Sequence, residues 1–245
     1  MALPKFNDTP IYEMIVPSTQ KKVKFRPFLV KEQKILLIAM ESQDEGQILE
    51  SILNTISSCV QGDFKVSDLS VFDIEYMLMR LRAKSVGEKA ELNIQCPDCE
   101  EGCDASVNLE DIEISNLKEE LPKIKVNDQY TIQLKYPKFN YVLNEMKNTK
   151  DTSISNQMSI LSRAVLDCLL SEEERISFED ETPEDIEEFV DSLPTEVFGE
   201  ILSFAQDLPT VTKSIEYHCD ACNKDHVREL SGMIDFFQYA SPTTI

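Results

Sequence analysis

The residue types that enzyme sites depend on are scarce in this sequence. Its 245 residues include only two histidines, His218 and His226, and only six glycines. The patterns HExxH and GxSxG and the glycine-rich phosphate-binding loop are all absent from the sequence. So few glycines also leave little material for a loop that wraps around a phosphate. We therefore expect that the protein is not an enzyme and has no catalytic residues.

Basic residues are also few. The chain has 24 Lys and Arg against 45 Asp and Glu, and its formal net charge is −21. Proteins that bind nucleic acid usually present a basic face, because contacts with phosphates supply much of their affinity. We therefore expect no nucleic acid among its partners. Residues 172–188 contain ten carboxylates, which suit either a basic protein partner or a simple solvated surface.

Long hydrophobic runs are missing as well. The longest apolar run covers residues 35–40, whereas a membrane-spanning helix needs about 20 apolar residues. The first residues lack the apolar centre of a signal peptide, so we expect a cytoplasmic protein with no membrane-spanning segment. The composition, 42% hydrophobic and 28% charged, is typical of a soluble globular protein. The length suits one large domain or two small ones.

The most informative motif in the sequence is a C-x2-C cysteine pair that occurs twice, at Cys96–Cys99 and at Cys219–Cys222. Each pair is preceded by an alternating stretch, residues 90–95 and 213–218, and followed by a second extended stretch. This pattern is typical of a zinc knuckle, a hairpin tip whose two thiolates face one metal ion, and two knuckles supply the four ligands of a tetrahedral site. We predict one structural Zn²⁺ bound by Cys96, Cys99, Cys219 and Cys222.

Other readings of the cysteines remain open. Cys103 follows Cys99 by four residues and His226 follows Cys222 by four, so either side chain is an alternative ligand, although both fit the start of a return strand. A thioredoxin-like redox pair would begin a helix after a strand, whereas these pairs lie between strands. An odd total of seven cysteines without a secretion signal argues against disulfides. We expect Cys59 and Cys168, on apolar helix faces, to be core residues.

Periodicity and turn signals predict an α+β fold. In the first part we expect strands at 11–16 and 22–26, helices at 31–42 and 47–60, a helix capped by Ser67 or Asp68 that runs to about 84, and the first knuckle hairpin at 88–109. In the second part we expect strands at 123–126 and 129–135, helices at 139–147, 155–171, 183–192 and 195–207, the second knuckle hairpin at 213–230 and a C-terminal helix.

The second part repeats the order of the first. Arg26-Pro27 matches Tyr136-Pro137 at an offset of 110 residues, and apolar helix positions match at similar offsets. We interpret this as an internal duplication into two similar lobes, 1–110 and 111–245, joined by a zinc-ribbon-like pair of knuckles, with the helix at 195–207 as an addition. Chance matching between amphipathic helices is the alternative.

Several segments resemble a known family. Residues 9–12, 15–19, 23–31, 72–76 and 81–88, together with the two cysteine pairs, are similar to the zinc-binding baseplate hub assembly (hub subunit) proteins of T-even-type contractile-tailed bacteriophages. The resemblance implies a non-catalytic structural role in forming the central hub of the tail baseplate, with other baseplate hub proteins as partners. It also implies a location in the cytoplasm of the infected bacterium or in the virion tail.

We therefore predict a scaffold or chaperone that acts through protein–protein contacts. The alternatives are a zinc-ribbon nucleic-acid-binding regulator and a CxxC thiol redox protein.

Overall fold

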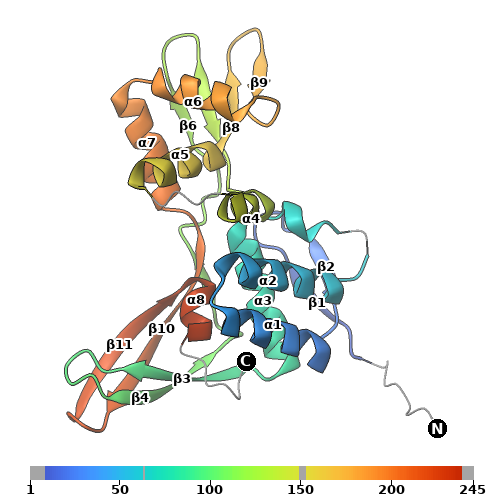
Figure 1. Cartoon of the computed structure of the whole chain (residues 1–245), viewed down its shortest axis with the longest axis vertical. Coiled ribbons are helices and arrows are strands. Elements are labelled where there is room, and N and C mark those ends of the chain that lie inside the picture. The colour runs from blue at the N-terminus through green and yellow to red at the C-terminus, as the bar shows by residue number, and fades with distance from the viewer. Residues whose placement is uncertain (1–8, 63, 149–152, 239–245) are drawn as a thin grey trace. The chain divides into compact units, whose positions relative to one another are not determined.

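The computed structural model describes residues 9–62, 64–148 and 153–238, and these form a mixture of helices and small antiparallel sheets (Figure 1). The α+β prediction is therefore confirmed. The chain divides into two compact units: the first consists of Met1–Ser115 and Thr210–Ile245, and the second of Asn116–Pro209. The second unit is thus inserted into the sequence of the first.

The helical part of the first unit follows the predicted order. Its elements are β1 (Tyr12–Ile15), β2 (Lys22–Phe25), α1 (Val30–Ser42), α2 (Glu45–Cys59), the short 3-10 helix η1 (Val66–Asp68) and α3 (Val71–Ser85). Strands β1 and β2 form a hairpin. Helix α3 is the central element, because its apolar side chains Phe72, Ile74, Met77, Leu78, Met79 and Leu81 are all almost completely buried. Cys59 at the end of α2 is fully buried, as predicted.

The predicted start of α3 was wrong. Neither Ser67 nor Asp68 caps it, because Val66–Asp68 form a separate 3-10 turn and the N-cap is Ser70. The Asp73 carboxylate accepts a hydrogen bond from the Ser70 N–H at 3.2 Å, and it also accepts bonds from the N–H and hydroxyl of Ser18 in the β1–β2 turn. One buried carboxylate therefore both caps α3 and holds the hairpin against it.

Two long hairpins complete the first unit. They are formed by β3 (Lys89–Gln95) with β4 (Gly102–Asn108) and by β10 (Thr210–Cys219) with β11 (Lys224–Ser231), and β5 (Glu113–Ser115) pairs with the start of β10. Strand β10 packs against β4, and the hairpins extend together away from the helices (Figure 1). Alternate side chains are buried between them, as a two-residue period requires: Ala90, Leu92, Ile94, Cys103, Ala105, Val107, Ile215 and Tyr217.

A buried carboxylate anchors the second hairpin to the helices. Glu75 of α3 accepts hydrogen bonds from the Thr210 hydroxyl (2.9 Å) and the Val211 N–H (3.1 Å) at the start of β10, and from the Met233 N–H (3.4 Å) in α8 (Gly232–Gln238). Gly232 lies beside it with φ of +70°, and a Cβ there would lie 3.3 Å from Glu75 Oε1. Only glycine fits this bend without strain.

The second unit is built on a four-stranded antiparallel sheet of order β6-β7-β8-β9. Its elements are β6 (Lys123–Lys125), β7 (Thr131–Leu134), α4 (Phe139–Asn148), α5 (Ile154–Val165), β8 (Leu166–Leu170), β9 (Arg175–Ser177), α6 (Pro183–Asp191) and α7 (Thr195–Gln206). Pro183 occupies the first turn of α6, as predicted. Apolar side chains of the sheet and of α5 and α7 form the core, among them Ile124, Ile132, Leu134, Val165, Leu166, Ile201 and Phe204.

The helix predicted at 155–171 is too long. It ends at Val165, and the next five residues form β8, in which Cys168 and Leu169 pair with Gln133 and Ile132 of β7. Cys168 is buried, as predicted, but it lies on a strand. A short apolar run fits both helical and extended spacing, and pairing with β7 decides the outcome here.

The structure does not support the predicted duplication. The hairpin β1–β2 stands alone as a two-stranded sheet, whereas its expected counterpart β6–β7 is part of a four-stranded one. The units also differ from the predicted lobes 1–110 and 111–245, because the second knuckle hairpin and α8 pack with the first unit. Amphipathic helices in general share this spacing of apolar positions, so the matched positions alone do not indicate a repeat.

The role of Glu75 can be tested by Glu75→Gln. Burial raises the pKa of Glu75, because it disfavours the charged carboxylate, and the three hydrogen-bond donors offset only part of this effect. The carboxylate therefore depends on those donors. An amide would place an N–H group against a backbone or hydroxyl donor. We expect the free energy of unfolding to fall by about 1–3 kcal/mol in denaturant titrations of the full chain. Glu91→Gln, at an exposed position on β3, is the matched control; equal effects of the two changes would contradict this role.

Candidate metal centre

The four predicted cysteines meet in space although 119 residues separate the two pairs. The Sγ atoms of Cys96, Cys99, Cys219 and Cys222 all lie within 4.8 Å of one another. The short contacts run between the hairpins: Cys96 Sγ lies 3.7 Å from Cys222 Sγ, and Cys99 Sγ lies 3.6 Å from Cys219 Sγ. The hairpin tips therefore bring together a set of four thiols from two sequence segments.

These separations suit a tetrahedral metal ion. Four thiolates at a zinc–sulfur distance of about 2.3 Å would lie about 3.8 Å apart along the edges of the tetrahedron. The observed sulfur–sulfur contacts of 3.6 and 3.7 Å and the upper limit of 4.8 Å bracket this value. The cluster can therefore hold one metal ion. Thiolates suit soft or borderline ions such as Zn²⁺, and their geometry does not identify the ion.

The two tips have the same backbone geometry. The residue after each second cysteine is left-handed, Glu100 with φ of 61° and Asn223 with φ of 54°. Its N–H donates to the carbonyl of the first cysteine of its pair, Cys96 at 2.9 Å and Cys219 at 2.8 Å. This tight turn directs both thiols of a pair to one side of the tip. Each left-handed residue directly follows the second cysteine of its pair. This shared position could have indicated the turn from the sequence, but our prediction used only the cysteine spacing and the flanking strands.

Crowded thiols resist ionising together. The backbone N–H of Cys222 donates toward Cys219 and lowers the pKa of Cys219 to about 6. Loss of solvent and the neighbouring thiols raise the pKa of Cys222 to about 12. A bound cation removes this conflict, because metal binding replaces the protons of the ligands. The cluster is thus better suited to a divalent ion than to four free thiols at neutral pH.

The two alternative ligands occupy different positions. Cys103 is buried on β4, where its thiol faces the carbonyl of Glu101 at 3.7 Å, and it is not in the group of four. His226 on β11 places Nε2 3.3 Å from Cys96 Sγ, close enough to donate to a metal-bound thiolate from outside the ligand set. His226 also lies within 4.8 Å of ligand atoms of Asp98 and Cys222, so it is the nearer substitute of the two.

Charged side chains around the tips join the hairpins further. Lys224 on the second knuckle pairs with Asp98 on the first at 2.5 Å. His218 on β10 lies 2.7 Å from Asp225, which raises the pKa of this histidine. His218 lies on strand β10 with its side chain partly exposed, and it is not in the group of four thiols. The sequence alone did not indicate the Asp98–Lys224 pair, because nothing local links the two positions.

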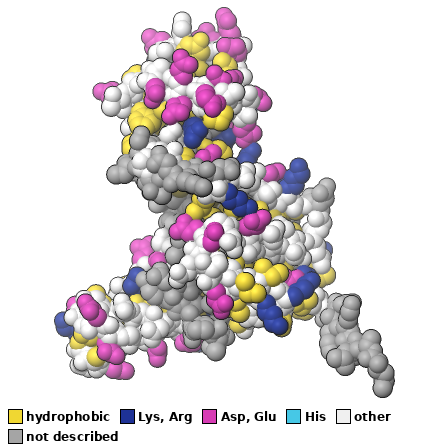
Figure 2. Space-filling view, viewed as in Figure 1, with side chains coloured by type: hydrophobic (Ala, Val, Ile, Leu, Met, Phe, Trp, Pro, Cys, Tyr) yellow, Lys and Arg dark blue, Asp and Glu magenta, His cyan; other side chains and the backbone are white. Residues whose placement is uncertain are grey.

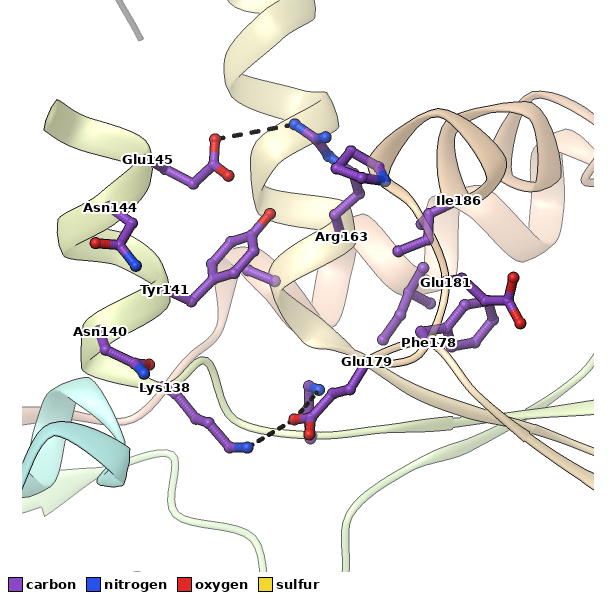
Figure 3. A pocket seen from close by; sticks show the side chains of 14 residues that line it. Lys138, Asn140, Tyr141, Asn144, Glu145, Arg163, Phe178, Glu179, Glu181 and Ile186 are labelled. Atoms are coloured by element: carbon purple, nitrogen blue, oxygen red, sulfur yellow. Dashed lines mark hydrogen bonds and ion pairs between the residues drawn. The ribbon is translucent and has the colours of Figure 1, made fainter. Parts of the chain in front are cut away.

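A second candidate is a cavity of about 390 Å³ within the second unit (Figure 3), a volume in the range of small-molecule sites. Lys135 and Lys138 both donate to Glu179 Oε1, at 2.9 and 2.6 Å, and these bonds lower the pKa of Glu179 to about 2. Arg163 lies 4.0 Å from Glu145. The charged groups in the cavity thus largely satisfy one another.

The described lining of the cavity offers few groups for nucleophilic catalysis. Its lining includes no His, Cys or Ser, and burial raises the pKa of Tyr141 to about 12, so the phenol stays protonated. The side chains that line it are those of Lys135, Lys138, Asn140, Tyr141, Asn144, Glu145, Arg163, Ala164, Leu166, Phe178, Glu179, Glu181, Pro183 and Ile186. The thiol cluster is therefore the stronger candidate site.

The left-handed turn at the first knuckle gives a direct test. A glutamate in this conformation costs about 1–2 kcal/mol relative to ordinary backbone. We expect Glu100→Gly to raise the free energy of unfolding by up to about 1 kcal/mol, after the larger chain entropy of glycine is subtracted. Asn223→Ala should lower it by about 1 kcal/mol, because alanine tolerates this conformation less well than asparagine. Thermal unfolding measures both changes, and a loss of stability in Glu100→Gly would show that the turn is not strained.

Comparison with known proteins places the chain in a family. The family described as T4 bacteriophage base plate protein matches residues 9–238. No curated protein and no solved structure matches the chain. Within the described ranges, no helix has the length and apolar character that a membrane crossing requires. The family match includes both units and all four clustered cysteines, and the chain therefore belongs to the T4 bacteriophage base plate protein family.

Proposed function

We propose that this protein helps to form the central hub of the phage tail baseplate, as a non-catalytic scaffold or chaperone stabilised by one structural Zn²⁺ at Cys96, Cys99, Cys219 and Cys222. The cluster of four thiols, all within 4.8 Å, is the observation that carries the proposal. It has four protein ligands and so leaves no open position for a substrate, which is the arrangement of a structural metal. Family membership supports a role in the phage baseplate.

The metal would act by fixing the two hairpins to each other. Apparent free energies of zinc binding reach about 10–16 kcal/mol in small zinc peptides, which is much more than one core contact supplies. The two hairpins, β3–β4 and β10–β11, would thereby keep a fixed shape. Other baseplate hub proteins could assemble on this shape, in the infected cell or in the virion tail. Such a role needs surfaces of defined shape and no reactive group.

Two other functions receive less support. A zinc-ribbon regulator of nucleic acid would need a basic surface, whereas the knuckle residues include Asp98, Asp104, Asp220 and Asp225. A thiol redox protein would bring the two sulfurs of one CxxC pair together. Here thiol contacts of 3.6 and 3.7 Å also join different pairs, and a set of four thiols favours a shared metal.

Metal analysis of purified protein tests the site. We expect about one zinc per chain by elemental analysis, loss of that zinc in Cys96→Ser and Cys219→Ser, and a sharp drop in melting temperature after chelation. Cys103→Ser is the matched control, because this buried thiol lies on the same hairpin outside the cluster; it should keep the zinc. An unchanged melting curve after complete metal removal would contradict a structural role.

Co-purification from infected cells tests the assembly role. A tagged full-length chain should retain other baseplate proteins. The Cys96→Ser variant should retain fewer, because its two hairpins are no longer fixed to each other. Recovery of the wild-type chain without any baseplate protein would count against the proposal. A salt-dependent gel shift with DNA or RNA would instead favour the nucleic-acid regulator.

A further inference from the structure

Helix α1 exposes aliphatic side chains that a surface helix normally buries. Val30 is 65% exposed, Ile35 50% and Ile38 67%, while the opposite face buries Leu36 and Ala39. Figure 2 shows hydrophobic side chains beside Lys or Arg side chains on the part of the first unit where Figure 1 draws α1. A stripe of this kind on a soluble protein is a common mark of an interaction site.

The charges around this stripe are separated along the helix. Residues 21–34, which lead into and begin α1, contain six Lys and Arg and one Glu, although the whole chain has a net charge of −21. Residues 41–50, at the end of α1 and the start of α2, contain four acids and no Lys or Arg. On α1 itself, the exposed bases Lys31 and Lys34 lie in the first half of the helix and the exposed Glu41 lies in its last turn.

Three exposed side chains place this change on one side of the helix. Lys34, Ile38 and Glu41 are spaced by four and three residues, so they lie in one row along about two turns. Ile38 stands near the middle of the row. A helix turned end for end about a twofold axis near Ile38 would place its own Glu41 opposite Lys34. The face is thus complementary to itself in an antiparallel arrangement, and a parallel one would set lysine against lysine.

We propose that the exposed face of α1 is a self-association surface, whose partner is α1 of a second copy of this chain in an antiparallel twofold contact. Ile38 packs near the axis, and Lys34 of each copy pairs with Glu41 of the other. Ile35, one turn before Ile38, extends the apolar contact. This inference does not depend on the metal site or on the proposed hub role.

The oligomeric state of the purified full-length protein tests the proposal, measured by sedimentation equilibrium. We expect a reversible dimer that Ile38→Asp weakens at least about tenfold, because it places two carboxylates at the axis. Lys34→Glu and Glu41→Lys should each weaken it about tenfold, since each change alters two symmetric pairs. The double variant Lys34→Glu/Glu41→Lys should recover the wild-type affinity, which loss of folding could not produce.

Val227→Asp is the matched control. Val227 is 71% exposed and is the most exposed large hydrophobic side chain among the described residues. Because it lies on β11 and not on α1, its change should leave the dimer intact. A wild-type chain that stays monomeric at about 100 µM overturns the proposal; another protein or a terminal segment of the same chain would then be what covers α1. A dimer that is insensitive to Ile38→Asp, or a double variant that is not rescued, also overturns it. None of these results depends on zinc content or on capture of baseplate proteins.

Discussion

The contact among four thiols joins the two hairpins of the first unit at their tips. It closes a chain loop between Cys99 and Cys219 that contains the entire second unit, Asn116–Pro209. Closing a loop of that length costs conformational entropy, and the cost grows only slowly with length. The β5–β10 ladder, with Ser115 opposite Thr210, brings the two ends of the insertion together. The second unit can therefore fold as an insertion while the hairpins on either side stay paired.

Strand β10 is held at both of its ends, by different chemistry. At its tip Cys219 belongs to the thiol cluster, and at its base the Glu75 carboxylate takes donors from Thr210 and Val211. Contacts at the thiol cluster join only the tips of the hairpins and do not connect their bases to the helices. The buried carboxylate supplies the missing connection to α3. The two hairpins and the helices are thus parts of one core, although they come from opposite ends of the sequence.

Sequence reasoning identified what local patterns encode. The C-x2-C spacing predicted the cysteines that meet, and Pro183 predicted the start of α6. It failed where tertiary contacts decide: pairing with β7 turned residues 166–170 into a strand, and Ser18, 55 residues from Asp73, helps to fix the start of α3. Glu75 could not be found, because a glutamate within a helix normally faces solvent and only its distant donors explain its burial.

The net charge of −21 shows why composition and surface must be read separately. A net charge this negative argues against phosphate binding, because the acids outnumber the bases over the chain as a whole. It says nothing about order along the chain. In the α1 region the bases lie before residue 35, and all the acids except the buried Glu32 lie after residue 40. Separation of this kind, around exposed aliphatic side chains, orients a contact, since only one relative direction brings unlike charges together. A strongly acidic chain can thus carry a surface whose charges are complementary to those of a second copy of itself.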